Sequence, residues 1–443
     1  MNGQMWGGSF DSIPPLATCD KTKPMDLDSV YEEQKVTTGT VLFTYDVIWR
    51  PSNIHWASRW DIYLSMDNAV PDKVHWFSIV NSVLIVLFLS SMIAMILIRN
   101  VHRDISHYNR VMTEEEKQGE REESGWKLVH TEVFRPPATL PMLFCVFVGT
   151  GFQVFWMAVF TVFFAAIGFL SPANRGSLMI AMLLAYVVMG GAAGYKSANL
   201  YKTFRGKQWQ KCTLLTAFLY PGLAFLVFFT FNTVLWSYGS SGAVPILSMV
   251  AIVALWFGIS VPLVFLGAYI GFRKEVHEYP VHPRAAAMPR PIPDQPWYLG
   301  TAFTVIIGGI LPFGACFVEL FFILSSMWMD QYYYVFGFLM LVFAILIVTC
   351  AEITVVLVYF QLCAEDYRWW WRSFLCSGST AVYVFLYSAF YFSKLEANLA
   401  VTYFLYFGYM AVICFGLFLM TGLVGYVSSL WFTKKIYGSI KVD

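Results

Sequence analysis

The sequence predicts an all-α membrane protein with nine transmembrane helices, and three observations point to that class. Only 13% of its 443 residues are charged and 58% are hydrophobic, whereas soluble domains carry roughly 25% charged residues. Nine apolar stretches each approach or exceed the roughly 20 residues that cross a bilayer. The basic residues also concentrate in alternate connections between these stretches. A water-soluble fold cannot bury so much apolar surface, so a polytopic protein is expected.

Each predicted crossing is helical because hydrocarbon cannot hydrogen-bond a free backbone group. The helices are expected near residues 76–98, 142–170, 177–195, 213–236, 246–272, 299–324, 333–360, 374–393 and 401–432. Residues 433–443 then form a short tail, so that 76–443 makes one nine-span transmembrane domain.

The distribution of positive charge predicts the orientation of this domain. Twenty-one lysines and arginines lie in one set of connections and in the tail, and two, Arg175 and Lys394, lie in the alternate set. Because positive loops stay on the cytosolic side, the C-terminus is expected in the cytosol and the N-terminus in the lumen. The net charge of +1 gives no reason to expect a nucleic-acid partner.

The first 75 residues carry a β-strand pattern. Between residues 38 and 49, alternate positions from Val41 to Trp49 are β-branched or aromatic, which is typical of a strand. One or two strands are not stable alone, and the chain does not start with a signal-peptide pattern. We therefore expect 1–75 to be the C-terminal remnant of a lumenal β-rich domain, in a fragment or short product that lacks its true start.

A series of segments, in order along the chain, closely resembles the nonaspanins, the transmembrane 9 superfamily, and in particular its longer members. These segments are Ile54–Asp61, His75–Asn81, Leu97–Asp104, Gly125–His130, Phe134–Pro137, Gly168–Gly176, Ile310–Gly314, Cys363–Trp369 and Lys434–Asp443. The resemblance implies a large lumenal domain before nine spans, and residence in Golgi and endosomal membranes. It also implies a role in sorting and localising other membrane proteins, with client transmembrane proteins as partners and no enzymatic activity.

The last three residues resemble the family's C-terminal Lys-x-Asp/Glu motif, which the COPI coat binds. Lys441 offers a cation, and Asp443 offers two carboxylates, its side chain and the chain terminus. The resemblance implies a Golgi-retention signal, and the alternative is an ordinary solvated tail.

Two carboxylates, Glu319 and Glu352, lie inside predicted spans. A charge in hydrocarbon is costly, so such residues usually face the bundle interior and are neutral or paired. They are either structural hydrogen-bonding groups or an intramembrane polar site, such as the proton or ion relay of a secondary transporter or channel-like protein.

Glycines and a proline mark two further features of the spans. Gly308, Gly309, Pro312 and Gly314 predict a helix break, or more simply a kink, because proline removes a backbone hydrogen bond. The glycines of 190–194 and 267–271 predict close helix packing inside the bundle, with a surface for client helices as the alternative.

Two cytosolic segments have distinctive composition. Trp369–Trp371, flanked by arginines, is expected to anchor the chain among lipid headgroups, with specific lipid or coat binding as the alternative. The proline-rich segment 280–296 is expected to be a stiff spacer or, less simply, a ligand for SH3 or WW domains. The sequence contains no nucleotide-binding, zinc-protease or nucleophile-elbow motif, so no cofactor, metal or catalytic residue is expected.

Overall fold

The computed structural model describes residue 51, a discontinuous set of residues between 80 and 106, and residues 125–167, 177–240, 242–275, 279–280, 289–328, 336–395 and 400–438. The chain divides into the units Met1–Asp61 and Ile62–Asp443, and the described helices all belong to the second. The strand predicted at 38–49 lies outside the described residues.

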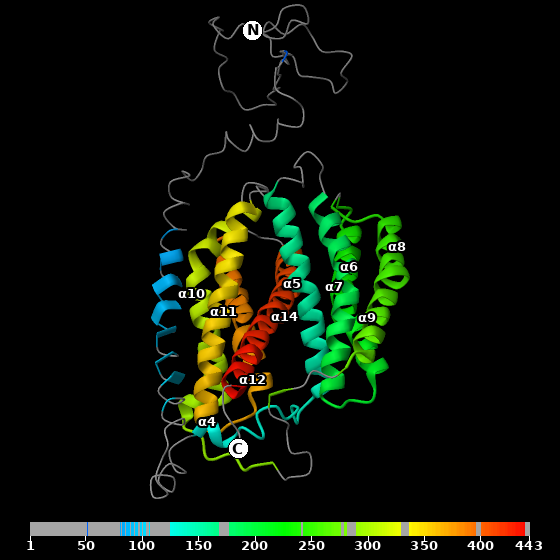
Figure 1. Cartoon of the computed structure of the whole chain (residues 1–443). Helices are drawn as coiled ribbons and strands as arrows, with labels where there is room; N and C mark the ends of the chain where they lie inside the picture. Colours follow the sequence, from blue (N-terminus) through cyan, green and yellow to red (C-terminus); the bar gives the residue numbers. More distant parts are fainter. Residues whose placement is uncertain are drawn as a thin grey trace, which may run out of the picture. The chain divides into compact units, whose positions relative to one another are not determined.

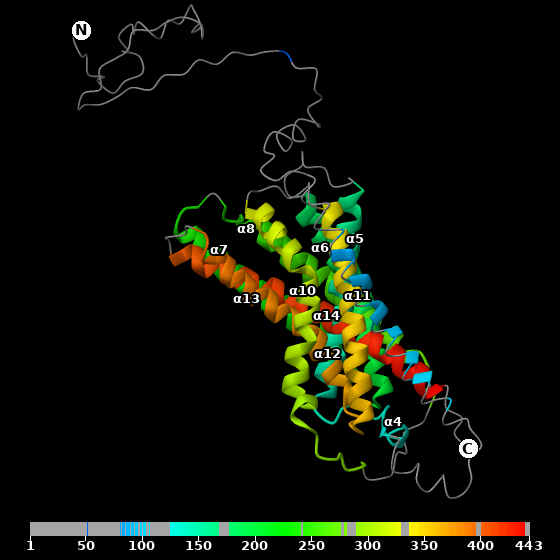
Figure 2. The same cartoon turned by 90° about the vertical axis from the view of Figure 1, so that its left-hand side faces the viewer.

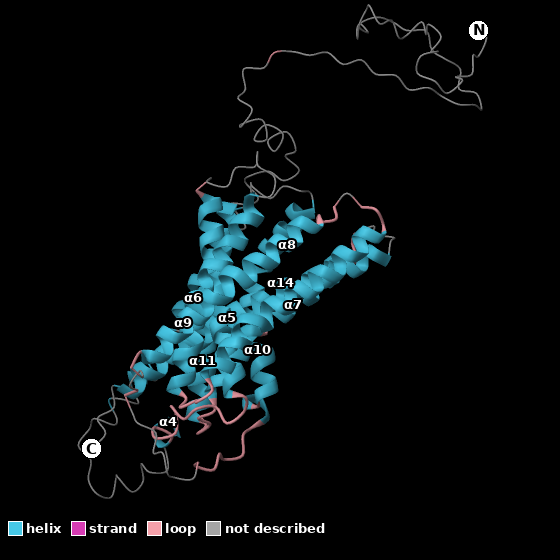
Figure 3. Cartoon of the chain, turned by 90° about the vertical axis from the view of Figure 1, so that its right-hand side faces the viewer, coloured by secondary structure: helices cyan, strands magenta, loops and turns pink. Residues whose placement is uncertain are grey.

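Helices make up the architecture of this unit, and its described residues contain no strand (Figure 3). The long helices are α5 (Pro141–Ala166), α6 (Ser177–Thr203), α7 (Trp209–Ser237), α8 (Ile246–Leu255), α9 (Val261–Arg273), α10 (Thr301–Trp328), α11 (Phe336–Cys363), α12 (Trp369–Gly378), α13 (Thr380–Phe392) and α14 (Ala400–Gly438). Three short elements complete the list: α4 (Gly125–Leu128), the π-helix η3 (Trp256–Ser260) and the 3-10 helix η4 (Trp297–Leu299).

Eight helical segments in the described part are long and apolar enough to cross a membrane. Two of them are composite, because α8, η3 and α9 form one segment and α12 and α13 form another. The remaining predicted span, 76–98, falls on residues that are described only in part, with a shorter apolar helix over Ser82–Met92. The all-α character is therefore confirmed for the described residues, and the count of nine spans stays a prediction.

The last helix, α14, joins two groups of helices. It packs against α5 and α7 of the first group and against α11, α12 and α13 of the second. In Figure 1 it crosses obliquely between them. The turned view in Figure 2 shows α7 and α13 strongly tilted relative to α11.

Glycines let α6 and α9 approach backbone to backbone. A Cβ placed on Gly267 would lie 1.8 Å from the carbonyl oxygen of Gly191, and one on Gly194 would lie 2.0 Å from that of Val264. A Cβ on Gly271 would lie 2.4 Å from the carbonyl oxygen of Tyr195. The prediction of close packing inside the bundle is confirmed for this pair of helices.

The helix break expected at Gly308–Gly314 is not present, because α10 continues as one α-helix through Pro312. Gly308 and Gly309 serve another purpose. A Cβ on Gly308 would lie 2.8 Å from the carbonyl oxygen of Cys376, and one on Gly309 would lie 2.7 Å from the backbone nitrogen of Thr380. The two glycines therefore let α10 pack directly on the junction between α12 and α13.

The interruptions of the spans lie elsewhere. Ser379 separates α12 from α13, and its hydroxyl lies 2.6 Å from the carbonyl oxygen of Val305 on α10. The π-helix η3 precedes Pro262, which has no N–H to continue the regular ladder. A π-turn is one way in which a helix absorbs such a defect.

Candidate functional site

The first of the two intramembrane carboxylates is Glu319 on α10, which is 1% exposed. The hydroxyl of Ser82, in the first apolar segment, donates a hydrogen bond to its Oε1 atom. The carboxylate is thus buried inside the bundle, and a polar group from a distant part of the sequence meets it there.

Glu352 on α11 has an equivalent arrangement. The hydroxyl of Ser90 donates to its Oε2 atom over 2.9 Å. Ser82 and Ser90 are eight residues apart, a spacing that places both on one stripe of a helix. That stripe also presents Val86, which packs in a small apolar cluster with residues of α10 and α11. Sequence reasoning missed the serines, although their spacing within an apolar run was available as a signal.

A hydroxyl can donate to either protonation state of a carboxyl group, so this arrangement suits a structural tie as well as a proton-binding site. In both cases the two hydrogen bonds attach the first apolar segment to α10 and α11 at two depths. The predicted polar site therefore consists of two serine–glutamate pairs rather than of two isolated acids.

A second candidate site is an aromatic cap at one end of the bundle, formed by residues 126–139, the start of α12, Tyr279 and the end of α14. The indole N–H groups of Trp369, Trp370 and Trp371 donate to the carbonyl oxygens of Val133, Arg135 and Thr139, each over 2.8 Å. Three consecutive side chains of α12 therefore hydrogen-bond to one loop segment.

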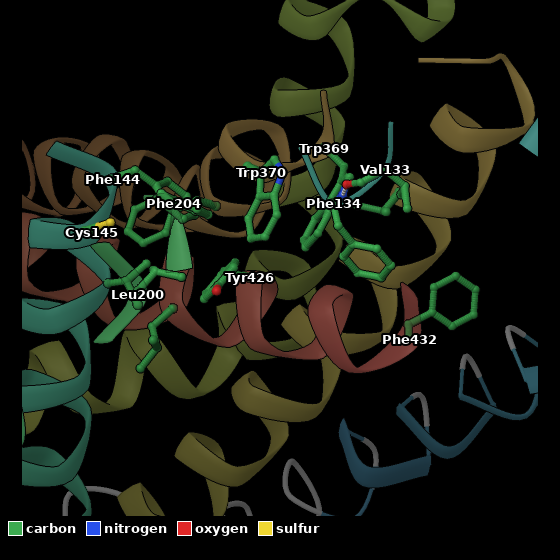
Figure 4. Packing of buried hydrophobic residues seen from close by; sticks show 14 of the residues in the cluster. Val133, Phe134, Phe144, Cys145, Leu200, Phe204, Trp369, Trp370, Tyr426 and Phe432 are labelled. Atoms are coloured by element: carbon green, nitrogen blue, oxygen red, sulfur yellow. Dashed lines mark hydrogen bonds between the residues drawn. The ribbon is translucent and has the colours of Figure 1, made fainter. Parts of the chain in front are cut away.

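The expectation that these tryptophans anchor among headgroups is wrong for Trp369 and Trp370, which are 0% and 1% exposed. Their rings stack on each other with centroids 4.3 Å apart, and Tyr426 of α14 lies next to them (Figure 4). A buried indole needs a partner for its N–H, and the loop carbonyls supply it. The cap is therefore part of the packed core, continuous with buried side chains of α5 and α14.

Phe134 and Tyr279 extend this packing, with stacked rings whose centroids are 4.6 Å apart. Burial raises the pKa of the Tyr279 hydroxyl well above its ordinary value.

One buried ion pair, through the hydrogen bonds of its arginine, holds the cap to the connection before α10. Asp366 and Arg372 are 3.2 Å apart, with side chains 2% and 6% exposed. Arg372 also donates to the carbonyl oxygen of Leu299 and to the hydroxyl of Thr301. Breaking such a pair on one side leaves a buried charge without compensation. The two hydrogen bonds of Arg372 fix the start of α10 against α12.

The described end of the proline-rich segment, 289–296, is bound to the cap. Arg290 forms an ion pair with Glu365 over 2.9 Å and donates to the carbonyl oxygen of Leu128. Gln295 donates to the carbonyl oxygen of Ala364. Residues 289–296, which we call the strap, are therefore bound to the rest of the protein. A segment held in this way is not free to act as a ligand of an SH3 or WW domain.

The C-terminal helix ends on the cap. The Tyr437 hydroxyl donates to the carbonyl oxygen of Trp126 over 2.8 Å, and the Lys434 ammonium lies 5.1 Å from the Tyr279 ring centroid. Lys441 and Asp443 lie outside the described residues, so the structure fixes only the point at which the tail leaves, Gly438.

The described residues offer no group of three or more His, Cys, Asp and Glu side chains that could hold a metal ion. The seven cysteines in that part of the chain are free thiols.

The length and apolarity of the helices define an integral multi-pass membrane protein. Residues 8–401 match the family described as endomembrane protein 70, and the chain belongs to this family, the transmembrane 9 superfamily.

Relatives from plants and mammals support this assignment. The chain is 55% identical over 438 residues to transmembrane 9 superfamily member 10 of Arabidopsis thaliana, which covers 98% of this chain and 67% of the relative. It is 47% identical over 423 residues to member 4 of Homo sapiens, an alignment that covers 95% of this chain and 64% of the relative. It is 51% identical over 405 residues to member 2 of Mus musculus, with 91% of this chain and 60% of the relative covered. The chain thus spans about two-thirds of the length of these relatives. No solved structure matches it.

Proposed function

We propose that this protein is a non-enzymatic Golgi and endosomal membrane protein that sorts and localises other membrane proteins, and that a coat-binding signal at its C-terminus retains it. Membership of a family described as endomembrane proteins supports an internal membrane. The excess of positive charge in alternate connections supports a lumenal N-terminus and a cytosolic C-terminus.

The observation that carries this proposal is the fixed end of α14. Tyr437 is bound to the cap, so the described part of α14 is held there up to Gly438. Lys441 and Asp443 follow three and five residues later in the sequence. A coat protein with a mixed-charge pocket, such as a COPI subunit, is the partner that this chemistry fits.

The retention signal is tested by changing its charges and following localisation. We expect Lys441→Ala, Asp443→Ala or an appended C-terminal tag to release the protein from the Golgi and to abolish binding of the tail to COPI. Lys435→Ala is the matched control, because it removes an exposed lysine from the last turn of α14 and leaves the signal intact. Unchanged localisation of the Lys441 and Asp443 variants would contradict the proposal.

Client binding is tested separately by crosslinking in membranes and identification of the bound membrane proteins. The glycines of α6 and α9 lie against the backbone of the other helix and are not open to a client helix. We therefore expect crosslinks from lipid-facing positions and none from the contact between α6 and α9. If no membrane protein is crosslinked to this protein in cells, the sorting function is not supported.

The two serine–glutamate pairs favour a second function, a secondary transporter or channel-like activity that uses Glu319 and Glu352. Intramembrane carboxylates in hydrogen-bonded chains are typical of proton relays. The test is a pH- or ion-gradient-dependent flux in liposomes, with Glu319→Gln and Glu352→Gln expected to abolish it. Capture of client proteins without any flux would decide for the sorting function.

A further inference from the structure

Two groups of cations at the cap end of the bundle have different surroundings. The first group is formed by arginines of the cap and its strap that make ion pairs: Arg135, Arg290, Arg368 and Arg372. The other group, which we call the basic corner, lies at the ends of α6, α7 and α9. It consists of Lys196, Lys202, Arg205, Lys207, Lys211, Arg273 and Lys274.

Within the described part of the chain, no ion pair neutralises the basic corner. Six of its seven cations are exposed, and Lys202 is half-buried. The exposed Glu275 is the carboxylate adjacent in sequence, and it pairs with none of them. The four arginines of the cap and its strap therefore have carboxylate partners, whereas the corner leaves a concentrated positive charge open to an external anion.

Contacts between helix ends hold the corner together. The Lys202 ammonium donates to the carbonyl oxygen of Lys274 over 2.7 Å, which joins the end of α6 to the end of α9. The ring of Trp209, the first residue of α7, stacks on Phe272 with centroids 5.8 Å apart. Cations contributed by three helices are thus collected in one place.

Aromatic rings orient several of these cations. Lys202 lies 5.6 Å from the ring centroid of Phe272, and Lys274 lies 5.8 Å from that of Tyr195. These contacts place the basic groups beside aromatic side chains, a combination typical of the headgroup level of a membrane.

Lys207 and Lys211 complete the corner without such contacts. Lys207 lies in the connection between α6 and α7, and Lys211 lies in the first turn of α7. No side-chain hydrogen bond caps the start of α7, and its first turn has no acidic residue. The partial positive charge of that helix end therefore adds to the charge of the two lysines.

We propose that the basic corner binds a membrane lipid with a multiply phosphorylated headgroup, a polyphosphoinositide of the cytosolic leaflet. Six exposed cations exceed what the single net charge of phosphatidylserine neutralises, whereas several phosphates on one ring match them. Basic groups between the cytosolic ends of transmembrane helices are a known setting for such headgroups. The proposal rests on the cytosolic orientation proposed above.

A lipid fits this place better than a soluble phosphate compound does. Next to the corner, α9 presents the exposed apolar side chains of Leu266 and Ile270, 56% and 52% exposed. Acyl chains can lie along this surface while the headgroup meets Lys207 and Lys211. The corner therefore joins a phosphate-binding end to a lipid-facing helix surface.

The test uses the purified full chain in detergent, titrated with dioctanoyl phosphatidylinositol 4,5-bisphosphate at 0.15 M salt and followed by tryptophan fluorescence. The key variant is Lys207→Gln/Lys211→Gln, and the matched control is Lys127→Gln/Lys435→Gln, which removes the same charge elsewhere. A lysine near an anionic surface contributes about 1 kcal/mol. We therefore expect the key variant to bind roughly 30-fold more weakly and the control to bind about as the parent does.

Two further ligands distinguish the sources of phosphate. Dioctanoyl phosphatidylserine and soluble inositol 1,4,5-trisphosphate should each bind at least tenfold more weakly than the lipid probe. No binding of the lipid probe, an equal loss in the control variant, or equal binding of phosphatidylserine would overturn the proposal. Equal binding of the soluble trisphosphate would assign the corner to a free anion instead.

Lys207 and Lys211 are exposed, so the key variant should fold. Lys211→Glu provides a second variant, which changes the charge by the same two units and should weaken binding by a similar factor. Because binding in detergent does not involve localisation, its failure would leave the retention signal and client binding to be judged by their own experiments.

Discussion

The packing of α6 on α9 gives the sharpest prediction, because a single methyl group should separate the two helices. In Gly267→Ala the new Cβ would start 1.8 Å from the carbonyl oxygen of Gly191, and ordinary contact begins at about 3.4 Å. The backbones must therefore move apart by about 1.6 Å, since a carbonyl oxygen in a helix cannot rotate away. Overpacking of this kind costs about 1–3 kcal/mol, and we expect the upper end of that range because backbone meets backbone.

Thermal unfolding in detergent, followed by tryptophan fluorescence, measures this loss as a lower midpoint. Gly314→Ala is the matched control: it makes the same change in α10, where no atom lies within 4 Å of the new Cβ. Alanine has a better helix propensity than glycine by about 1 kcal/mol, so the control should be as stable as the parent or slightly more so. If Gly267→Ala unfolds at the control's midpoint, the reasoning is refuted.

Three further predictions concern the cap and the spans. Asp366→Asn should destabilise the protein by about 3–5 kcal/mol by leaving Arg372 as an uncompensated buried charge. The double variant Asp366→Asn/Arg372→Met should regain most of the lost stability. Additive losses in the double variant would argue against the pair. Trp369→Phe keeps much of the ring packing but leaves the Val133 carbonyl without its indole partner, so the unfolding midpoint should fall by the equivalent of about 1–3 kcal/mol. Glu352→Gln should keep the fold, because an amide oxygen still accepts the serine hydrogen bond, whereas Glu352→Leu should lower the midpoint; equal midpoints would show that the hydrogen bond contributes nothing.

Much of the fold is predictable because the bilayer allows so few structures. Apolar length alone requires a helix, and α5, α6, α7, α10, α11 and α14 appear where apolar runs predicted them. Local glycine spacing likewise predicted the seam between α6 and α9. In each case the signal lies within one segment of sequence, and the surrounding fold does not have to be known.

The interruptions of the helices were not predictable in the same way. Pro312 lies inside a continuous α10, while Ser379, without any proline beside it, ends α12. The position of the break depends on packing, since the Ser379 hydroxyl donates to the Val305 carbonyl on α10 and Gly309 leaves room for Ser379. Such partners are distant in sequence, and hydropathy carries no information about them.

The burial of the cap tryptophans was likewise not predictable from the local sequence. A run of three tryptophans next to arginines indicates an interfacial anchor when only composition is considered. The partners that bury Trp369 and Trp370 lie some 235 residues earlier, among loop carbonyls that resemble those of any other loop. The two serines that meet Glu319 and Glu352 are a similar case, since only their register identifies them.

The cap also bears on how the protein is made. Its loop carbonyls leave the ribosome 236 residues before Trp369, and the carbonyl of Trp126 leaves 311 residues before Tyr437. At roughly 5–20 residues per second, the early half waits on the order of 10–60 s for its partners. Until α14 has been inserted, Phe134 lacks its edge contact with the Tyr437 ring, and the carbonyl of Trp126 lacks the Tyr437 hydroxyl. Closure of the cap therefore reports that synthesis of the membrane part is complete, and a chain that stops before α14 would lack both of these contacts.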